Sequence, residues 1–262
     1  ERVMTTLCGR LGDRQLGRVD TTLLESSHVL QIGVSRGLSS TVTLHRSGLG
    51  HSTLIDNQAV ESENIGQTLF NVSQLGKRKV EAAKDLILAV APAAIVETHA
   101  VLAKDVPDLH VIIANADLVK IGVDNPAAQF ELADAAQSLN TPALIHGMTG
   151  DGQQFYSALV LPGGKRLREL LPQAWEGVSQ GYRPPEFFPS CALHTEIMNS
   201  AVALMIAGVL HHRAGSSISM MADIGAGLAQ AGLATGFNGF HQPSGFFAPI
   251  FFGFHGLAKR FR

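Results

Sequence analysis

The chain has 262 residues and a formal net charge of −2 at pH 7, which gives enough length for a large hydrophobic core and too little positive charge for an extended basic surface. Nucleic acid is therefore not expected as the main ligand, whereas a locally held nucleotide fits this composition. Cys8 and Cys191 are the only cysteines, and no CxxC pair is present. We therefore expect a reducing cytoplasm, no disulfide framework and no zinc site.

The apolar stretches predict neither export nor membrane insertion. The first residues contain no apolar run followed by a small-residue cleavage site, so no signal peptide is expected. The longest apolar stretch, residues 197–210, is interrupted by Asn199, Ser200 and Gly208 and is too short to span a bilayer. It predicts a buried helix, and no membrane span is expected.

The hydrophobic pattern predicts strands that alternate with helices. Residues 1–27 are polar with an apolar stripe, which indicates a helical lead-in. Strands are predicted at residues 29–33, 52–56, 94–99, 111–114, 118–124, 143–146 and 155–161, and helices at 79–91 and 125–138. This alternation favours an α/β fold that is Rossmann-like, with a mostly parallel, doubly wound sheet and helices on both faces. Its ligand crevice would lie at the carboxyl ends of the strands.

The last hundred residues differ in composition from the rest of the sequence. Gly163-Gly164 and the proline-rich residues 184–189 interrupt regular structure and predict a crossover loop, which a helix follows at about 195–213. A Gly- and Phe-rich tail, residues 246–254, is too apolar for a free linker. We therefore expect a lead-in at 1–28, a nucleotide-binding domain at 29–162 and a C-terminal extension at 163–262 that packs on the same domain.

The turn after the first predicted strand is a degenerate glycine fingerprint. It reads Gly33-Val34-Ser35-Arg36-Gly37-Leu38-Ser39-Ser40, with Ser35 and Ser39 where glycines would let the backbone approach a pyrophosphate. Arg36 adds a cation that would either attract an anion or face water. The motif alone fits a phosphate-binding turn and an ordinary strand-to-helix turn equally well.

Two groups further along the chain fit a nucleotide. Asp56 ends the next strand about twenty residues after Gly33, the spacing of a carboxylate that binds ribose hydroxyls; the alternative is a solvated strand-end carboxylate. Lys79 opens a helix within Gly76-Lys77-Arg78-Lys79. It would either reach phosphate oxygens as a point charge or belong to a solvated, charged helix face.

Asp124 and Cys191 also have two interpretations each. Asp124 follows an apolar strand and precedes Asn125-Pro126, so it would either hold Mg²⁺ beside phosphates or cap the next helix. Cys191 precedes a predicted helix, where a thiolate would gain from the helix dipole, but a lone cysteine is commonly a small buried hydrophobe. His194 and the pair His211-His212 have no companions at metal spacing and are interpreted as structural.

Taken in order, these motifs resemble the ThiF/MoeB/HesA superfamily, the bacterial relatives of the ubiquitin-activating enzymes. The resemblance spans roughly residues 29–161. It is carried by Val29-Leu30-Gln31-Ile32-Gly33, Arg46-Ser47-Gly48-Leu49-Gly50, Leu54-Ile55-Asp56, Val60-Glu61 with Asn64 and Gln67-Thr68-Leu69-Phe70, Gly76-Lys77-Arg78-Lys79-Val80-Glu81-Ala82-Ala83 and Asp124-Asn125-Pro126-Ala127-Ala128. More narrowly, Pro189-Ser190-Cys191 with Asn199-Ser200-Ala201-Val202-Ala203 is similar to the ThiF-type proteins of the PRTRC gene systems.

The resemblance implies an adenylating domain, usually a homodimer, that binds ATP with Mg²⁺. Such a domain activates the C-terminal carboxylate of a small β-grasp protein, either ubiquitin-like or a sulfur carrier. By position, Asp56 would hold the ribose, Asn64 and Lys79 the phosphates and Asp124 the metal, and Cys191 would take the acyl group as a thioester. The remaining residues implied in the nucleotide site are Gly33, Ser35, Arg36, Gly37 and Gln67.

The chain departs from the family pattern at two places. The family loop reads Gly-x-Gly-Gly-x-Gly-Ser, whereas this turn has lost glycines, and the family's Asn-Ile-Gly-Arg-Gln is here Asn64-Ile65-Gly66-Gln67 without an arginine. Arg2, Arg10 or Arg14 would have to supply the missing cation. Two further functions therefore stay open: a non-catalytic ThiF-like subunit that acts as a binding scaffold, and an NAD-dependent oxidoreductase that uses Asp56 for the ribose.

Overall fold

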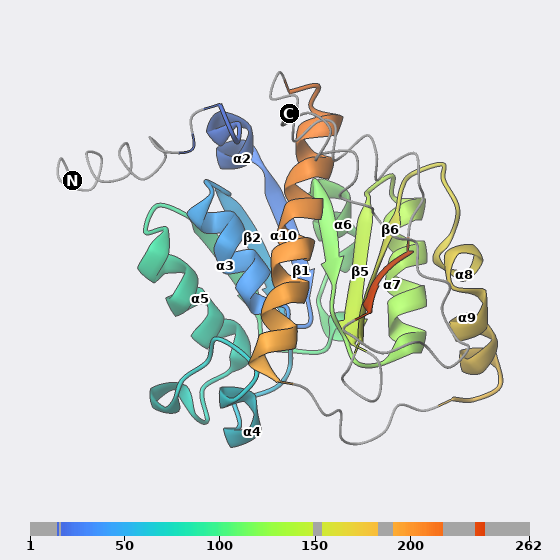
Figure 1. Ribbon diagram of the computed structural model, residues 1–262, viewed down its shortest axis with the longest axis horizontal. Coiled ribbons are helices and arrows are strands. Elements are labelled where there is room, and N and C mark those ends of the chain that lie inside the picture. Colours follow the sequence, from blue (N-terminus) through green and yellow to red (C-terminus); the bar gives the residue numbers. More distant parts are fainter. Residues whose placement is uncertain (1–14, 16, 149–153, 183–190, 217–233, 239–262) are drawn as a thin grey trace.

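The computed structural model describes residues 15, 17–148, 154–182, 191–216 and 234–238, and these form one sheet covered by helices on both faces (Figure 1). The strand order is β3-β2-β1-β4-β5-β6-β7. Neighbours from β3 to β5 pair in parallel, whereas β5–β6 and β6–β7 are antiparallel. The strands are β1 (His28–Ile32), β2 (His51–Ile55), β3 (Ile95–His99), β4 (Leu118–Ile121), β5 (Ala143–Met148), β6 (Gln154–Val160) and β7 (Ala234–Asn238).

The helices divide between the two faces of the sheet. On one face lie α3, α5 and α10, with α5 over β2 and β3 and α10 over β1, β4, β5 and β6. On the other face α6 and α7 pack over β1, β4 and β5. Because both faces are covered, the central strands are almost continuously buried. The helices are α2 (Thr21–Ser26), α3 (Leu38–Arg46), α4 (Ser62–Ile65), α5 (Lys79–Val90), α6 (Leu109–Asn115), α7 (Pro126–Ser138), α8 (Leu167–Leu170), α9 (Pro172–Ser179) and α10 (Ala192–Arg213), with 3-10 turns η2 (Val72–Gln74) and η3 (Ala103–Asp105).

The predicted α/β, mostly parallel, Rossmann-like sheet is confirmed, with one element wrong. Residues 111–114, predicted as a strand, lie in helix α6. A short apolar run does not distinguish a strand from a buried helix, and here the burial follows a helix, because Ile113 is buried while Val111 is exposed. The strand predicted at 118–124 also stops early, at Ile121.

Some predictions fall outside the described residues. Of the predicted lead-in at 1–27, residues 21–26 form α2, and residues 1–14, with Cys8, are not described. The same holds for the proline-rich loop at 184–189 and for the Phe-rich tail at 246–254.

Helix α10 is the buried helix predicted at 195–213, and it begins three residues earlier. Among the described residues it alone is long and apolar enough to cross a membrane, and 61% of its most apolar window is buried inside the fold. Met198, Val202, Ile206 and Leu210 recur every four residues and pack on the sheet beside α3. This is the arrangement of a core helix.

His45, near the end of α3, is a buried neutral histidine. Its Nδ1 lies 2.7 Å from the carbonyl of Leu49, which only accepts, so Nδ1 carries the proton and Nε2 accepts from Ser52 Oγ at 2.8 Å. Burial lowers the pKa of His45 from its usual value of 6.5 to about 4, although the bond to Leu49 acts in the opposite direction. Protonation therefore favours the unfolded chain.

We expect the free energy of unfolding to fall as the pH drops from 6.5 towards 4. At pH 5 the contribution of His45 alone is about 2 kcal/mol, because the unfolded chain binds the proton and the folded chain does not. Urea unfolding at pH 7.5 and pH 5 measures this difference, and His45→Gln should reduce it. His110→Gln removes an exposed histidine and is the control; an equal pH response in both variants would contradict the assignment.

Candidate active site

The turn between β1 and α3, residues 33–37, lies at the carboxyl edge of the parallel strands. Gly33 has φ +89°, and a Cβ there would lie 2.5 Å from the carbonyl oxygen of Gly122, the residue after β4. Gly37 is the N-cap of α3, and a Cβ there would lie 2.4 Å from Cε1 of His146. Packing therefore requires glycine at both positions of the turn.

Asp56 ties this turn to the end of β2. Its Oδ2 accepts from the backbone N–H of Val34 at 2.7 Å, and its Oδ1 accepts from that of Gln58 at 2.8 Å. Burial raises the pKa of Asp56, while these two bonds and the charge of Lys79 act against the rise. The freely solvated carboxylate of the alternative interpretation is thus wrong.

Lys79 opens α5 and is buried, with 4% of its surface exposed. Its Nζ donates to Oε1 of Gln58 at 2.7 Å, next to the segment that Asp56 anchors. The solvated-face interpretation therefore fails for Lys79, although it fits its exposed neighbours Lys77, which pairs with Asp85, and Arg78. The structure brings the amine of Lys79 close enough to Asp56 for the two charges to interact.

Asp124 joins the same region through Arg36. An Nη2 of Arg36 donates to Oδ1 of Asp124 at 2.9 Å, and the Asp124 side chain is 68% exposed. Its charge also raises the pKa of Asp56, so the two carboxylates are electrostatic neighbours. The helix-capping interpretation of Asp124 is wrong, because Asn125 caps α7 by accepting from Ala127 N–H at 3.0 Å.

The surroundings of Asp124 fit a magnesium ion. In proteins Mg²⁺ binds one or two carboxylates, phosphate oxygens and several waters. Asp124 offers an exposed carboxylate whose Oδ2 bonds to no group in the described part of the chain. No cluster of three or more His, Cys, Asp or Glu side chains suited to a metal occurs in that part, so a magnesium ion here would depend on phosphate oxygens for its other ligands.

Asn64 and Gln67 lie on and after α4 and make local bonds. Oδ1 of Asn64 accepts from Glu61 N–H at 2.9 Å and completes a capping box, and Nε2 of Gln67 donates to Glu63 O at 3.1 Å. The carbonyl of Gln67 accepts from Thr195 Oγ1 at 3.2 Å, which joins α4 to α10. Within the described part of the chain, Asn64 forms no hydrogen bond with Asp56, Lys79 or Asp124.

Cys191 is exposed at the N-cap of α10 with a free thiol. The interpretation as a small buried hydrophobe is therefore wrong. His211, by contrast, is structural as predicted, since its Nε2 accepts from Asp20 N–H at 2.8 Å and its Nδ1 donates to Ala207 O at 2.7 Å. Arg2, Arg10 and Arg14, the proposed replacements for the missing arginine, lie outside the described residues.

The first turns of α10 bond to the start of α3, which the sequence motifs did not predict. Ser39 Oγ donates to Oε2 of Glu196 at 2.7 Å. Asn199 Oδ1 accepts from Ser40 N–H at 3.1 Å, and its Nδ2 donates to the carbonyl of Arg36 at 2.7 Å. The helix that carries Cys191 thus holds the candidate nucleotide turn from one side.

A cluster of four buried polar side chains beneath the turn was also not predicted from the sequence. It consists of Gln31, Thr41, Lys120 and His146, each at most 3% exposed. Burial strongly lowers the pKa of Lys120, and burial together with the charges of Lys120 and Arg36 lowers that of His146. One signal was visible in the sequence, because Lys120 interrupts the apolar run Leu118–Ile121.

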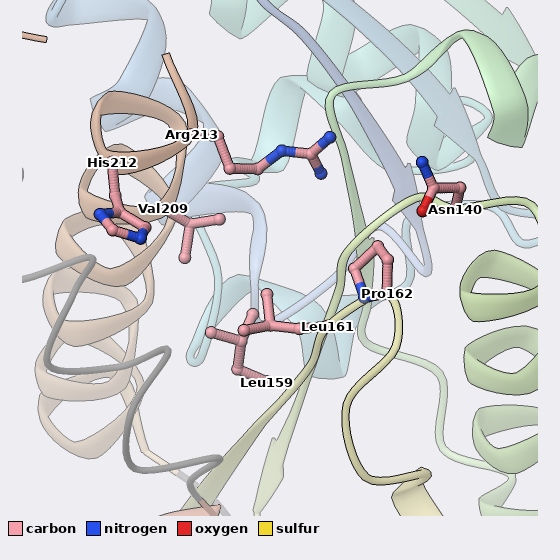
Figure 2. Close-up of a pocket in the computed structure, with 7 residues that line it drawn as sticks. All are labelled: Asn140, Leu159, Leu161, Pro162, Val209, His212 and Arg213. Atoms are coloured by element: carbon pink, nitrogen blue, oxygen red, sulfur yellow. The ribbon is translucent and has the colours of Figure 1, made fainter. Parts of the chain in front are cut away.

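The pocket in Figure 2 is a separate feature. Leu159, Leu161 and Val209 form its apolar part, and Figure 2 shows Arg213 reaching from α10 towards Asn140 above it. Asn140 precedes β5 and Leu161 follows β6, so the pocket lies at the amino edge of the parallel strands, opposite Asp56 and Asp124. It is not part of the candidate active site.

The contact between Gly37 and His146 predicts a compensating pair of substitutions. Gly37→Ala should destabilise the fold by about 1–3 kcal/mol, because its methyl group would overlap the His146 ring. His146→Ala should itself be destabilising, but in the double variant it removes the overlap. Urea unfolding of the two single variants and the double variant would then give a double variant more stable than additivity predicts, whereas simple additivity would contradict the proposed clash.

Several curated proteins have sequences similar to that of this chain. A probable adenylyltransferase/sulfurtransferase MoeZ of Mycobacterium tuberculosis is 27% identical over 181 residues, covering 64% of this chain and 42% of MoeZ. The molybdopterin-synthase adenylyltransferase of Escherichia coli is 35% identical over 127 residues, covering 47% of this chain and 50% of that protein. The chain thus spans about half the length of these relatives.

Solved structures agree on the fold. PaaA matches with a TM-score of 0.59 and 25% identity, over 72% of this chain and 66% of that one. MccB of E. coli matches with a TM-score of 0.58 and 21% identity, over 72% and 56%. The ThiF family model matches residues 12–241, which is most of the sequence. The chain belongs to the ThiF family.

Proposed function

We propose that this chain uses ATP and Mg²⁺ to adenylate the C-terminal carboxylate of a small protein of the ubiquitin-like or sulfur-carrier kind. The main support is the grouping of Asp56, Lys79 and Asp124 beside the turn at residues 33–37, at the carboxyl edge of a parallel sheet. Family membership and relatives named as adenylyltransferases agree with this chemistry.

In the proposed first step, the substrate carboxylate attacks the α-phosphorus of ATP, and the bond to the β-phosphate breaks to release pyrophosphate. Asp56 would accept from the ribose hydroxyls, and Lys79, a buried cation, would neutralise phosphate charge. Arg36 would offer a second cation at the turn, in place of the arginine absent after Gly66. Mg²⁺ on Asp124 would lower the charge repulsion between carboxylate and phosphates.

In the proposed second step, the thiolate of Cys191 attacks the acyl carbonyl, and AMP leaves as a thioester forms. The exposed thiol at the start of α10 supports this role, because a helix N-terminus favours a thiolate. The proposed partner is a β-grasp carrier protein, and the proposed assembly is a cytoplasmic homodimer.

A scaffold without turnover is the second candidate. Its specific support is the Glu196 carboxylate, which accepts from Ser39 in the first turn of α3, where a phosphate would otherwise gain from the helix dipole. Asp124 is also already paired with Arg36. An NAD-dependent oxidoreductase is the weakest candidate, since it leaves the buried Lys79 without a role.

ATP–pyrophosphate exchange with purified carrier proteins tests the adenylation. We expect exchange with a carrier that ends in Gly-Gly, and a loss of about 100-fold or more in Asp124→Asn, which keeps the shape but removes the charge. Asp105→Asn changes an exposed carboxylate of η3 and is the control. If the wild-type chain shows neither exchange nor an ATP-induced thermal shift, the scaffold candidate is favoured.

A thioester at Cys191 has its own test. After incubation with ATP and carrier, we expect an adduct that dithiothreitol removes and that Cys191→Ser abolishes, while pyrophosphate exchange continues. Cys8→Ser, at the other cysteine of the chain, is the control. An adduct that persists in Cys191→Ser would remove this thiol from the mechanism.

A further inference from the structure

A continuous chain of buried hydrogen bonds runs behind the turn at residues 33–37. Gln31 and Lys120 are paired residues of the neighbouring strands β1 and β4, and Thr41 lies above them on α3. Lys120 Nζ donates to Thr41 Oγ1 at 2.9 Å, and Thr41 Oγ1 donates to Oε1 of Gln31. All three side chains have no exposed surface.

The two ends of this series of hydrogen bonds are bonded to the two ends of the turn. Nε2 of Gln31 donates to the carbonyl of Gly33 at 2.9 Å, and Nζ of Lys120 donates to the carbonyl of Gly37. Between them, the carbonyl of Arg36 accepts from Asn199 Nδ2 at 2.7 Å. Three of the five carbonyls of the turn are therefore bound by side chains of the protein.

The backbone N–H groups of the turn are used differently. That of Val34 donates to Asp56, but no group in the described part of the chain accepts from Ser35 N–H or Gly37 N–H. Free backbone N–H groups beside a helix start and a cation, here α3 and Arg36, form a concave donor site for an anion. Most carbonyls of the turn are thus bonded within the protein, whereas two of its N–H groups remain as donors for a phosphate.

We propose that Gln31, Thr41 and Lys120 are positioning residues for the nucleotide turn, fixing its carbonyls inward so that the N–H groups of Ser35 and Gly37 stay available to a phosphate of ATP. This inference rests on the proposed function and names how that site is built. In a glycine-rich loop, the backbone itself adopts the shape that phosphate binding requires. Here side chains from β1, β4 and α3 impose the shape on a turn that has serine and arginine in place of glycine.

Two matched substitutions separate positioning from stability. Thr41→Val breaks the network at its centre without changing side-chain shape. Thr141→Val removes a hydroxyl that is also buried and that donates to the carbonyl of Ile113 in α6 at 2.9 Å. Thr141 lies far along the chain from the turn. Both variants should have a lower thermal midpoint. Thr41→Ser keeps the hydroxyl and should restore every property lost in Thr41→Val.

Hydrogen exchange without ligand tests the positioning directly. We expect the hydrogen-bonded amides of residues 33–38, those of Gly33, Val34 and Leu38, to exchange at least about tenfold faster in Thr41→Val than in wild type, and at the wild-type rate in Thr141→Val. Equal exchange across this segment in both variants would overturn the inference. This measurement needs no ATP, so it decides the positioning role even if the proposed adenylation fails.

ATP binding by calorimetry then tests the consequence for the site. We expect about tenfold weaker ATP binding in Thr41→Val, and unchanged binding in Thr141→Val and Thr41→Ser. Wild-type affinity in Thr41→Val would overturn the inference, whereas absent binding in the wild-type chain would count against the proposed function. Lys120→Met is a second variant; replacing the buried amine with an apolar chain should keep the fold stable while loosening the turn.

Discussion

The geometry of the candidate site depends on the contact between the backbones of Gly33 and Gly122. These residues follow β1 and β4, and no side chain fits between them. Because the ends of the two strands touch, Arg36 beyond one strand reaches Asp124 beyond the other. The distance between the cation of the turn and the exposed carboxylate is therefore set by backbone packing, and the remaining groups of the site are arranged around this pair.

The polar groups beneath the turn are costly and are balanced by their mutual bonds. A buried amine such as Lys120 loses its hydration, so it is tolerated only where hydrogen bonds replace water. Thr41 and Gly37 supply such bonds. His146 is less well compensated, since neither ring nitrogen has a partner within the described part of the chain. Its ring instead fills the space that Gly37 and Gly122 leave open.

The sheet, and the positions of the polar residues that follow its strands, could be predicted from the sequence because both depend on local patterns. Asp56 and Asp124 follow apolar strands, and parallel strands bring their carboxyl ends to one edge. The helix at 109–115 was missed because four apolar residues carry too little periodicity to separate helix from strand. The roles of Glu196 and Asn199 were not predictable, since their bonds to α3 span 157 residues or more and depend on how α10 crosses the sheet.

Burial itself was the other property that patterns predicted poorly. Lys79 stands among exposed cations and has the composition of a solvated face, yet it is enclosed because the segment after Asp56 folds over it and offers Gln58. Cysteine is a residue type that is common in protein cores, yet Cys191 is exposed. In both cases the tertiary path of a loop decides the environment, and a loop path is not encoded in a periodic pattern.

The complete enclosure of Lys120 gives the fold an internal reporter of its own opening. An acylating reagent, or a lysine acetyltransferase, can reach this amine only when α3 separates from β1 and β4. Labelling of Lys120 in the folded protein would therefore count separation events. An acetylated Lys120 recovered from cells would mark a molecule that was modified before its core had closed or while α3 was separated from the sheet.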